Sequence, residues 1–136
     1  MALSKEARRN VEYYSDIDLA FIPHPVTGKL SRKTNRNAVR QSVKSLVLTN
    51  FYERPFQPNI GCNVRAMLFE LFTPATKQKL ENAVREVIYN YEPRAEVIEV
   101  IAEQRDDLNA LTLSLAFYVI NDPEPVVLDV ILERVR

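Results

Sequence analysis

The sequence is poor in the residues from which many active sites are built. Its 136 residues include one cysteine, one histidine and two glycines. Cys62 has no second cysteine for an intrachain disulfide, and with His24 it supplies too few ligands for an ordinary zinc site. Gly28 and Gly61 cannot form a glycine-rich phosphate loop. We therefore expect no metal and no cofactor, and we expect Cys62 to be a buried or half-buried thiol.

Long apolar runs are also missing. Residues 1–6 lack the apolar core of a secretory signal. No run approaches the roughly 18 apolar residues that indicate a membrane span. The length suits one domain. These features predict a soluble protein that folds in a reducing compartment and has no membrane partner.

Charge is balanced overall but uneven along the chain. Eighteen basic residues match eighteen acidic ones, yet residues 1–54 carry ten bases against five acids, and residues 55–136 carry eight against thirteen. This polarity either orients the protein between unlike neighbours or reflects one solvated basic helix. The bases between residues 26 and 44, a stretch without an acid or an aromatic residue, are Lys29, Arg32, Lys33, Arg36, Arg40 and Lys44. Without aromatic residues for base stacking, a solvated or partner-facing surface is favoured over a specific nucleic-acid site.

Prolines and helical periodicity divide the first two thirds of the chain. Pro23 and Pro25 exclude a regular helix near them, so residues 1–34 are predicted to be an extended arm with a turn at Gly28. An apolar stripe predicts a helix from about Asn35. Residues 54–61 form a proline-rich loop that is expected to pack against the protein through Phe56 and Ile60. The stripe residues of this first helix and of a short second one are Val39, Val43, Leu46, Val47, Val64, Met67, Leu68, Leu71 and Phe72.

A third helix is predicted more firmly, from Thr73 as N-cap and Pro74 as first residue to an end by Glu92. The period then changes to two, which predicts three strands joined by short turns at 106–109 and 121–125. The inward residues of these strands are Ile98, Val100, Ala102, Leu111, Leu113, Leu115, Phe117, Val119, Val126, Leu128, Val130 and Leu132. The predicted fold is α+β, with three helices on one face of a three-stranded antiparallel meander spanning residues 35–136.

Pairs of Asp or Glu side chains are the remaining candidates for catalysis. A glycoside hydrolase requires two carboxylates roughly 5–9.5 Å apart across a cleft. Asp16 and Asp18 lie on the arm, Glu70 is expected within a helix, and Glu92 at a helix end. Eighteen acids always offer such pairs, so a structural role is favoured and no catalytic residue is assigned.

Glu92-Pro93-Arg94 stands at the junction of the third helix and the first strand. Proline restricts the backbone between two opposite charges. Arg94 can then form a bidentate pair with a carboxylate of this chain or of a partner. The simpler interpretation is a helix stop flanked by two surface charges.

An ordered set of short motifs resembles a known family. The set comprises Tyr14-Ser15-Asp16-Ile17-Asp18, Arg54-Pro55-Phe56 with Pro58, Gly61 and Cys62, Leu68-Phe69-Glu70 before Thr73-Pro74, Tyr91-Glu92-Pro93-Arg94, and Asn121-Asp122-Pro123. It is similar to the contractile-tail baseplate wedge proteins that include the gene-25 product of T4-type phages and the W protein of P2-type phages. Type VI secretion systems carry a related subunit.

The resemblance implies a structural subunit of a virion tail baseplate, made in the host cytoplasm and present in six copies around the tail axis. Its implied partners are other wedge proteins, the tail sheath protein, and tube or hub proteins. Glu92, Pro93 and Arg94 would contact the wedge, supported by Arg54, Pro55 and Phe56. Val126, Leu128, Val130 and Leu132 would lie on the strand that pairs with the sheath. The alternative function is a lysozyme-like peptidoglycan hydrolase of the tail.

Overall fold

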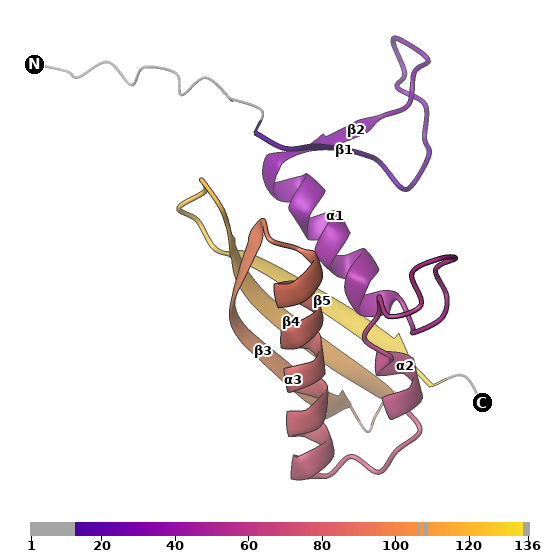
Figure 1. The fold of residues 1–136 in the computed structure, drawn as a ribbon, viewed down its shortest axis with the longest axis vertical. Helices are drawn as coiled ribbons and strands as arrows, with labels where there is room; N and C mark the ends of the chain where they lie inside the picture. The colour runs from indigo at the N-terminus through magenta and orange to yellow at the C-terminus, as the bar shows by residue number, and fades with distance from the viewer. Residues whose placement is uncertain (1–12, 106, 108, 135–136) are drawn as a thin grey trace, which may run out of the picture.

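The computed structural model describes residues 13–105, 107 and 109–134, and it confirms the α+β class (Figure 1). Helices α1 and α3 cover one face of an antiparallel sheet of order β3-β4-β5. The elements are β1 (Ser15–Ile17), β2 (Arg32–Thr34), α1 (Asn35–Leu48), α2 (Val64–Met67), α3 (Pro74–Tyr91), β3 (Ala95–Arg105), β4 (Ala110–Val119) and β5 (Val126–Glu133).

Both long helices begin where the sequence predicts, and α3 also ends where predicted. α1 begins at Asn35, and its apolar stripe is buried. The hydroxyl of Thr73 accepts a hydrogen bond from the Thr76 N–H at 3.2 Å, which satisfies one of the free donors of the first turn of α3. α3 ends at Tyr91, because Pro93 has no N–H with which to continue the helix.

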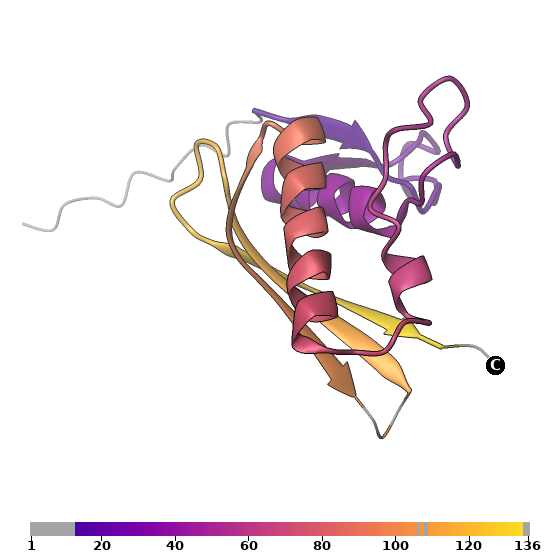
Figure 2. The ribbon, with the colours of Figure 1, turned by 60° about the horizontal axis from the view of Figure 1, so that its bottom comes forward.

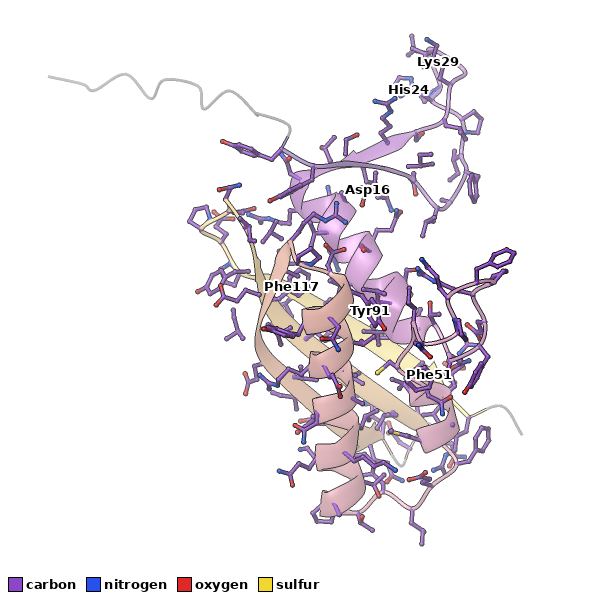
Figure 3. The ribbon with its side chains drawn as sticks, viewed as in Figure 1. Asp16, His24, Lys29, Phe51, Tyr91 and Phe117 are labelled. Carbon is purple, nitrogen blue, oxygen red and sulfur yellow. The ribbon has the colours of Figure 1, made fainter. Side chains whose placement is uncertain are left out.

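The core lies between these helices and the inward face of the sheet. β5 alternates strictly and β4 does so from Leu111 onward, and every residue predicted to face inward on them is buried. Phe117 is the largest fully buried side chain (Figure 3). Val100 and Ala102 of β3 also face the core.

The prediction for Ile98 is wrong, since its side chain is largely exposed. The pairing of β3 with β4 shifts between Val97 and Glu99, which leaves Ile98 as the extra residue of a β-bulge. A bulge reverses the alternation on one side of it, and Val97 packs against the core instead. A strict period of two therefore misplaces one residue.

The second helix is shorter than predicted. α2 ends at Met67, Phe69 and Leu71 are exposed, and Glu70 lies outside any helix. Of the stripe residues beyond α2, Leu68 is buried and Phe72 packs against the core.

The predicted N-terminal arm projects from the rest of the chain, and its residues 13–34 fold back on themselves as a hairpin. Its first twelve residues lie outside the described part of the chain. β1 and β2 pair antiparallel, from Ser15 opposite Thr34 to Ile17 opposite Arg32. The predicted turn is present, with the Gly28 N–H donating to the His24 carbonyl at 2.9 Å. The hairpin lies on the side of α1 away from the three-stranded sheet, with His24 and Lys29 near its tip (Figures 1 and 3).

The proline-rich loop is anchored at its base and open at its tip. The Cys62 N–H donates to the Thr49 carbonyl at 2.9 Å. A Cβ on Gly61 would lie 2.6 Å from the carbonyl carbon of Asn50, so only glycine fits this close approach. Ile60 is half-buried, but Phe56 is fully exposed. The prediction that Phe56 packs down is therefore wrong.

Candidate functional site

A charged cluster forms where α3 turns into β3. Glu92 is only 3% exposed. The Arg94 Nε donates to its Oε1 at 2.7 Å, and the Arg94 Nη2 donates to its Oε2 at 2.9 Å. The hydroxyl of Ser42 on α1 donates to the same Oε2. The pair therefore joins the two helices to the first strand of the sheet.

Glu92 is ionised in this setting. Burial alone would raise its pKa, but the hydrogen bonds from Arg94 and Ser42 and the charge of Arg94 outweigh burial, so the pKa of Glu92 is lowered. The bonds to Glu92 and Asp16 raise the pKa of Arg94. A general acid needs the opposite shift, so this buried carboxylate has the wrong protonation for a hydrolase acid.

The hairpin is tied to the same cluster. Asp16 of β1 accepts bonds from Arg94 Nη1 at 3.2 Å and Nη2 at 3.1 Å, and the guanidinium lies 5.5 Å from the centre of the Tyr14 ring. In Figure 3, Asp16 lies at the hairpin, near the N-terminal end of α1. Arg94 therefore uses its bidentate capacity within this chain. Pro93 and part of Arg94 are open to a partner, whereas Glu92 is not.

Two bases of the predicted basic run also pair within the chain. Arg36 donates to both carboxylate oxygens of Asp122 at 2.9 Å and to Glu124 at 3.0 Å. Lys33 lies 3.3 Å from Asp18. Hydrogen bonds from Ala20 and Lys33 lower the pKa of Asp18. These pairs hold the start of α1 to the β4–β5 turn and close the hairpin.

The loop that carries Arg54, Pro55 and Phe56 reaches the end of α3. The Tyr91 hydroxyl donates to the Asn59 carbonyl at 3.4 Å. This bond ties the base of the loop to the C-terminal end of α3. The three loop residues themselves project outward, with Arg54 partly exposed and the other two exposed.

β5 is an edge strand. One hydrogen bond shows which of its backbone groups point away from β4, toward the free edge. The Arg134 N–H donates to the Asn109 carbonyl at 3.0 Å, which directs the backbone of Arg134 toward β4. In an antiparallel ladder this direction alternates. The residues whose N–H and C=O groups point to the free edge are Val127, Asp129, Ile131 and Glu133. The predicted Val126, Leu128, Val130 and Leu132 face the core, so only the backbone of this strand is available for pairing.

β3 is the other edge, and it is obstructed. Leu113 points toward β5 by the same alternation, so its partner Ala102 points away from β4. The Ala102 N–H donates to the Glu81 Oε1 of α3 at 3.0 Å. The bulge at Ile98 interrupts this strand as well. Sequence reasoning did not find Glu81 or Ser42, because no local pattern marks a helix side chain that bonds a distant strand or carboxylate.

A shallow groove runs along the open edge of β5. Residues of α1 and α2 and those after α2 line one side of it. Figure 2 shows α2 close to the C-terminal end of β5. The lining residues are Lys44, Leu48, Arg65, Leu68, Phe69, Asp129, Val130, Ile131, Leu132 and Glu133.

Two of the carboxylates weighed for catalysis, Asp16 and Glu92, meet at Arg94, and both are paired with that base. Asp18 is paired with Lys33, and Glu70 is exposed. His24 is exposed, and its Nδ1 accepts backbone hydrogen bonds from Val26 and Thr27. Cys62 is buried, as predicted, and this burial raises the pKa of its thiol to about 12, which disfavours the reactive thiolate. Among the described residues, none of the helices has the length and apolarity needed to span a membrane.

Comparison with known proteins gives concordant matches. The family model described as "Baseplate wedge protein gp25" matches residues 33–124. The baseplate wedge protein gp25 of Enterobacteria phage T4 is 30% identical over 113 residues, which cover 83% of this chain and 85% of that protein.

Solved structures are similar as well. A chain of the anti-feeding prophage baseplate has a TM-score of 0.71 and 25% identity, with 82% of this chain and 89% of that chain covered. A chain of the post-contraction pyocin R2 baseplate has a TM-score of 0.62 and 19% identity over 78% of this chain and 98% of that one. A protein of Geobacter sulfurreducens described as a putative tail lysozyme has a TM-score of 0.64 and 23% identity, covering 72% and 89%. The last two likenesses concern the fold alone.

Proposed function

The chain belongs to the gp25 family of baseplate wedge proteins, and from that premise we propose that it joins other wedge proteins and begins the tail sheath in a contractile particle. Its role is structural, in the baseplate of a phage tail or a related machine. The proposal adds two contact surfaces to this role, one for the sheath and one for the wedge.

The open edge of β5 carries the sheath part of the proposal. Val127, Asp129, Ile131 and Glu133 direct a row of backbone donors and acceptors outward, and an exposed edge of this kind accepts an added strand. The opposite edge is obstructed by Glu81 and the bulge. A sheath subunit would therefore add its strand beside β5.

Replacing edge N–H groups tests this pairing. Asp129→Pro/Ile131→Pro removes two outward donors and leaves the bonds to β4 in place, because proline is tolerated where the N–H faces solvent. Asp129→Ala/Ile131→Ala is the matched control that keeps both donors. Particles with the proline variant should have baseplates without sheath in electron micrographs, and the alanine variant should keep its sheath. Normal sheaths on proline-variant baseplates, from protein with a wild-type circular dichroism spectrum, would refute the proposal.

The wedge surface combines Pro93 and Arg94 with the loop of Arg54, Pro55 and Phe56. The Tyr91–Asn59 bond ties the base of this loop to the end of α3, the helix that Pro93 and Arg94 follow. Glu92 acts from inside by fixing Arg94. A fully exposed phenylalanine on a proline-restricted loop is the type of residue that dominates interfaces. Phe56→Ser should reduce co-purification with the other wedge proteins, and Tyr89→Ser, which removes an equally exposed aromatic from α3, should not.

The remaining parts of the proposal follow from family membership: six copies around the tail axis, contact with tube or hub proteins, synthesis in the host cytoplasm, and no membrane or specific nucleic-acid partner. We also propose that the chain is not an enzyme. The lowered pKa of Glu92 and the pairing of Asp16 and Asp18 with bases support this. A murein zymogram of the purified chain should show no lysis. A cleared zone that disappears in Glu70→Gln or Glu92→Gln would establish the lysozyme-like alternative.

A further inference from the structure

The groove beside β5 has opposite charges on its two sides. Lys44 of α1 and Arg65 of α2 lie on the helical side, and Asp129 and Glu133 lie on the strand. The apolar residues between them are Leu48, Leu68, Val130 and Leu132. Within the described residues, no ion pair is formed by any of these four charged side chains.

We propose that this groove selects an extended partner segment by a charge code: apolar residues with an acid on the face toward α1, and a base on the opposite face. The inference rests on the proposed pairing of β5 and adds the chemistry of the partner. It assigns Lys44, Arg65, Asp129 and Glu133 as specificity-determining residues.

The inward half of the code follows from strand geometry. A strand added to β5 continues its alternation, so every second side chain would lie beside Leu128, Val130 and Leu132 and below the helices. There it would meet apolar residues together with Lys44 and Arg65. Arg65 lies near Glu53 and contributes weakly to its lowered pKa, after the hydrogen bonds from Asn50. An acid in the partner would therefore give both bases a closer counterion.

The outward half follows from the side chains that share the free-edge backbone. Partner residues directly opposite Asp129 and Glu133 would have their side chains on the solvent face, next to these carboxylates. Lysine or arginine there would form cross-strand pairs, whereas aspartate or glutamate would repel them. Val127 and Ile131 on the same face are more than half exposed and favour apolar neighbours.

The same charges disfavour a second copy of this chain as the occupant. The β5 strand of a second copy would place its own Asp129 and Glu133 on the solvent face beside the same two carboxylates. Its inward residues would be Leu128, Val130 and Leu132, with no acid for Lys44 or Arg65. A segment of a different protein satisfies both sides of the groove.

Two labelled ten-residue peptides test the code against the full-length chain. Both carry valines on one face, which directs that face inward. The first has a glutamate among the valines and lysines on the other face, and the second exchanges these charges. Fluorescence anisotropy should show about tenfold tighter binding of the first, because several partly exposed charge pairs contribute a few-fold each. The preference should diminish at high salt.

Charge reversal tests whether Lys44 and Arg65 cause the preference between the two peptides. Lys44→Glu/Arg65→Glu should abolish or invert the preference, while Lys29→Glu/Arg40→Glu, two exposed bases outside the groove, should leave it unchanged. Asp129→Pro/Ile131→Pro should prevent binding of both peptides. If both peptides bind equally well and Asp129→Pro/Ile131→Pro abolishes their binding, the charge code is overturned and the β5 pairing stands. If the proline variant binds the peptides as the wild type does, or if neither peptide binds the wild type, the charge code and the β5 pairing are both overturned.

Discussion

The two edges of the central sheet have the same backbone chemistry and opposite accessibility. At β3 the helix α3 supplies Glu81 to the Ala102 N–H, and a bulge at Ile98 interrupts the ladder. At β5 the groove leaves the edge open, and the alternation with β4 has no irregularity. Proteins that avoid edge-to-edge association protect both edges with devices of this kind. Protection of one edge alone makes the sheet directional, because strands can be added at β5 and not at β3.

Leu128→Pro should have the largest effect of the substitutions that test this comparison. Leu128 directs its N–H toward β4 and its side chain into the core, so proline removes a ladder bond and a buried leucine. The free energy of unfolding should fall by about 4 kcal/mol. Asp129→Pro, one residue away, should cost less than about 1 kcal/mol because its N–H faces outward. Urea titrations would compare them, and equal losses would show that the assignment of the open edge is wrong.

Glu92→Gln should have the second-largest effect on the free energy of unfolding. It should leave the accessibility of the β5 edge unchanged. Removing one partner of a buried pair should cost about 3 kcal/mol, yet the peptide preference of the β5 groove should persist. The folded-state pKa of Glu92 lies below its ordinary value of 4.5, so its contribution is present above that pH and is lost as the pH falls through the lowered pKa. Stability of the variant should therefore change less than that of the wild type at acidic pH. If the free energies of unfolding of the variant and the wild type depended on pH in the same way, this role of Glu92 would be contradicted.

Glu81→Gln should weaken the protection of β3. A hydrogen bond to a carboxylate is replaced by one to a neutral amide, for a loss of about 1 kcal/mol. Amide hydrogen exchange at Ala102 should accelerate, and association of the protein through β3 should become detectable by sedimentation. Lys77→Ala is the matched control, since Lys77 approaches Glu81 only at 3.8 Å and as an exposed pair. Unchanged exchange in Glu81→Gln would mean that the bulge alone protects this edge.

Ile131→Lys should have the smallest effect on stability. The side chain is exposed on the solvent face of β5, so the free energy of unfolding should change by no more than about 0.5 kcal/mol. A lysine beside the open edge should nevertheless reduce binding of the lysine-bearing peptide described above, because like charges would meet across the strands. Unfolding curves and anisotropy titrations on the same samples would show whether peptide binding weakens while the free energy of unfolding stays the same.

Sequence patterns predicted the parts of the fold that repeat locally. Leu111 to Val119 alternate without interruption, and Thr73-Pro74 and Pro93 bracket α3. The errors lie where a single residue departs from its period, as Ile98 does in the bulge, or where a segment is held by distant partners. The hairpin depends on Asp16 reaching Arg94, and the protection of β3 depends on Glu81, and neither contact has a signal in nearby sequence. Glu92-Pro93-Arg94 was identified from its chemistry, but its burial follows only from the packing of α1 against α3.

The bond between Asp16 and Arg94 also limits when the hairpin can be anchored during synthesis of the chain. The two residues are 78 positions apart, and Arg36 and Asp122 are 86 apart. During synthesis, the hairpin leaves the ribosome long before the arginine that anchors it, and the start of α1 leaves before its acidic partner. Arg94 is made before β3, so its bond to Asp16 can form before any strand of the three-stranded sheet has been synthesised. The bond of Arg36 to Asp122 can form only after β3 and β4 have been made.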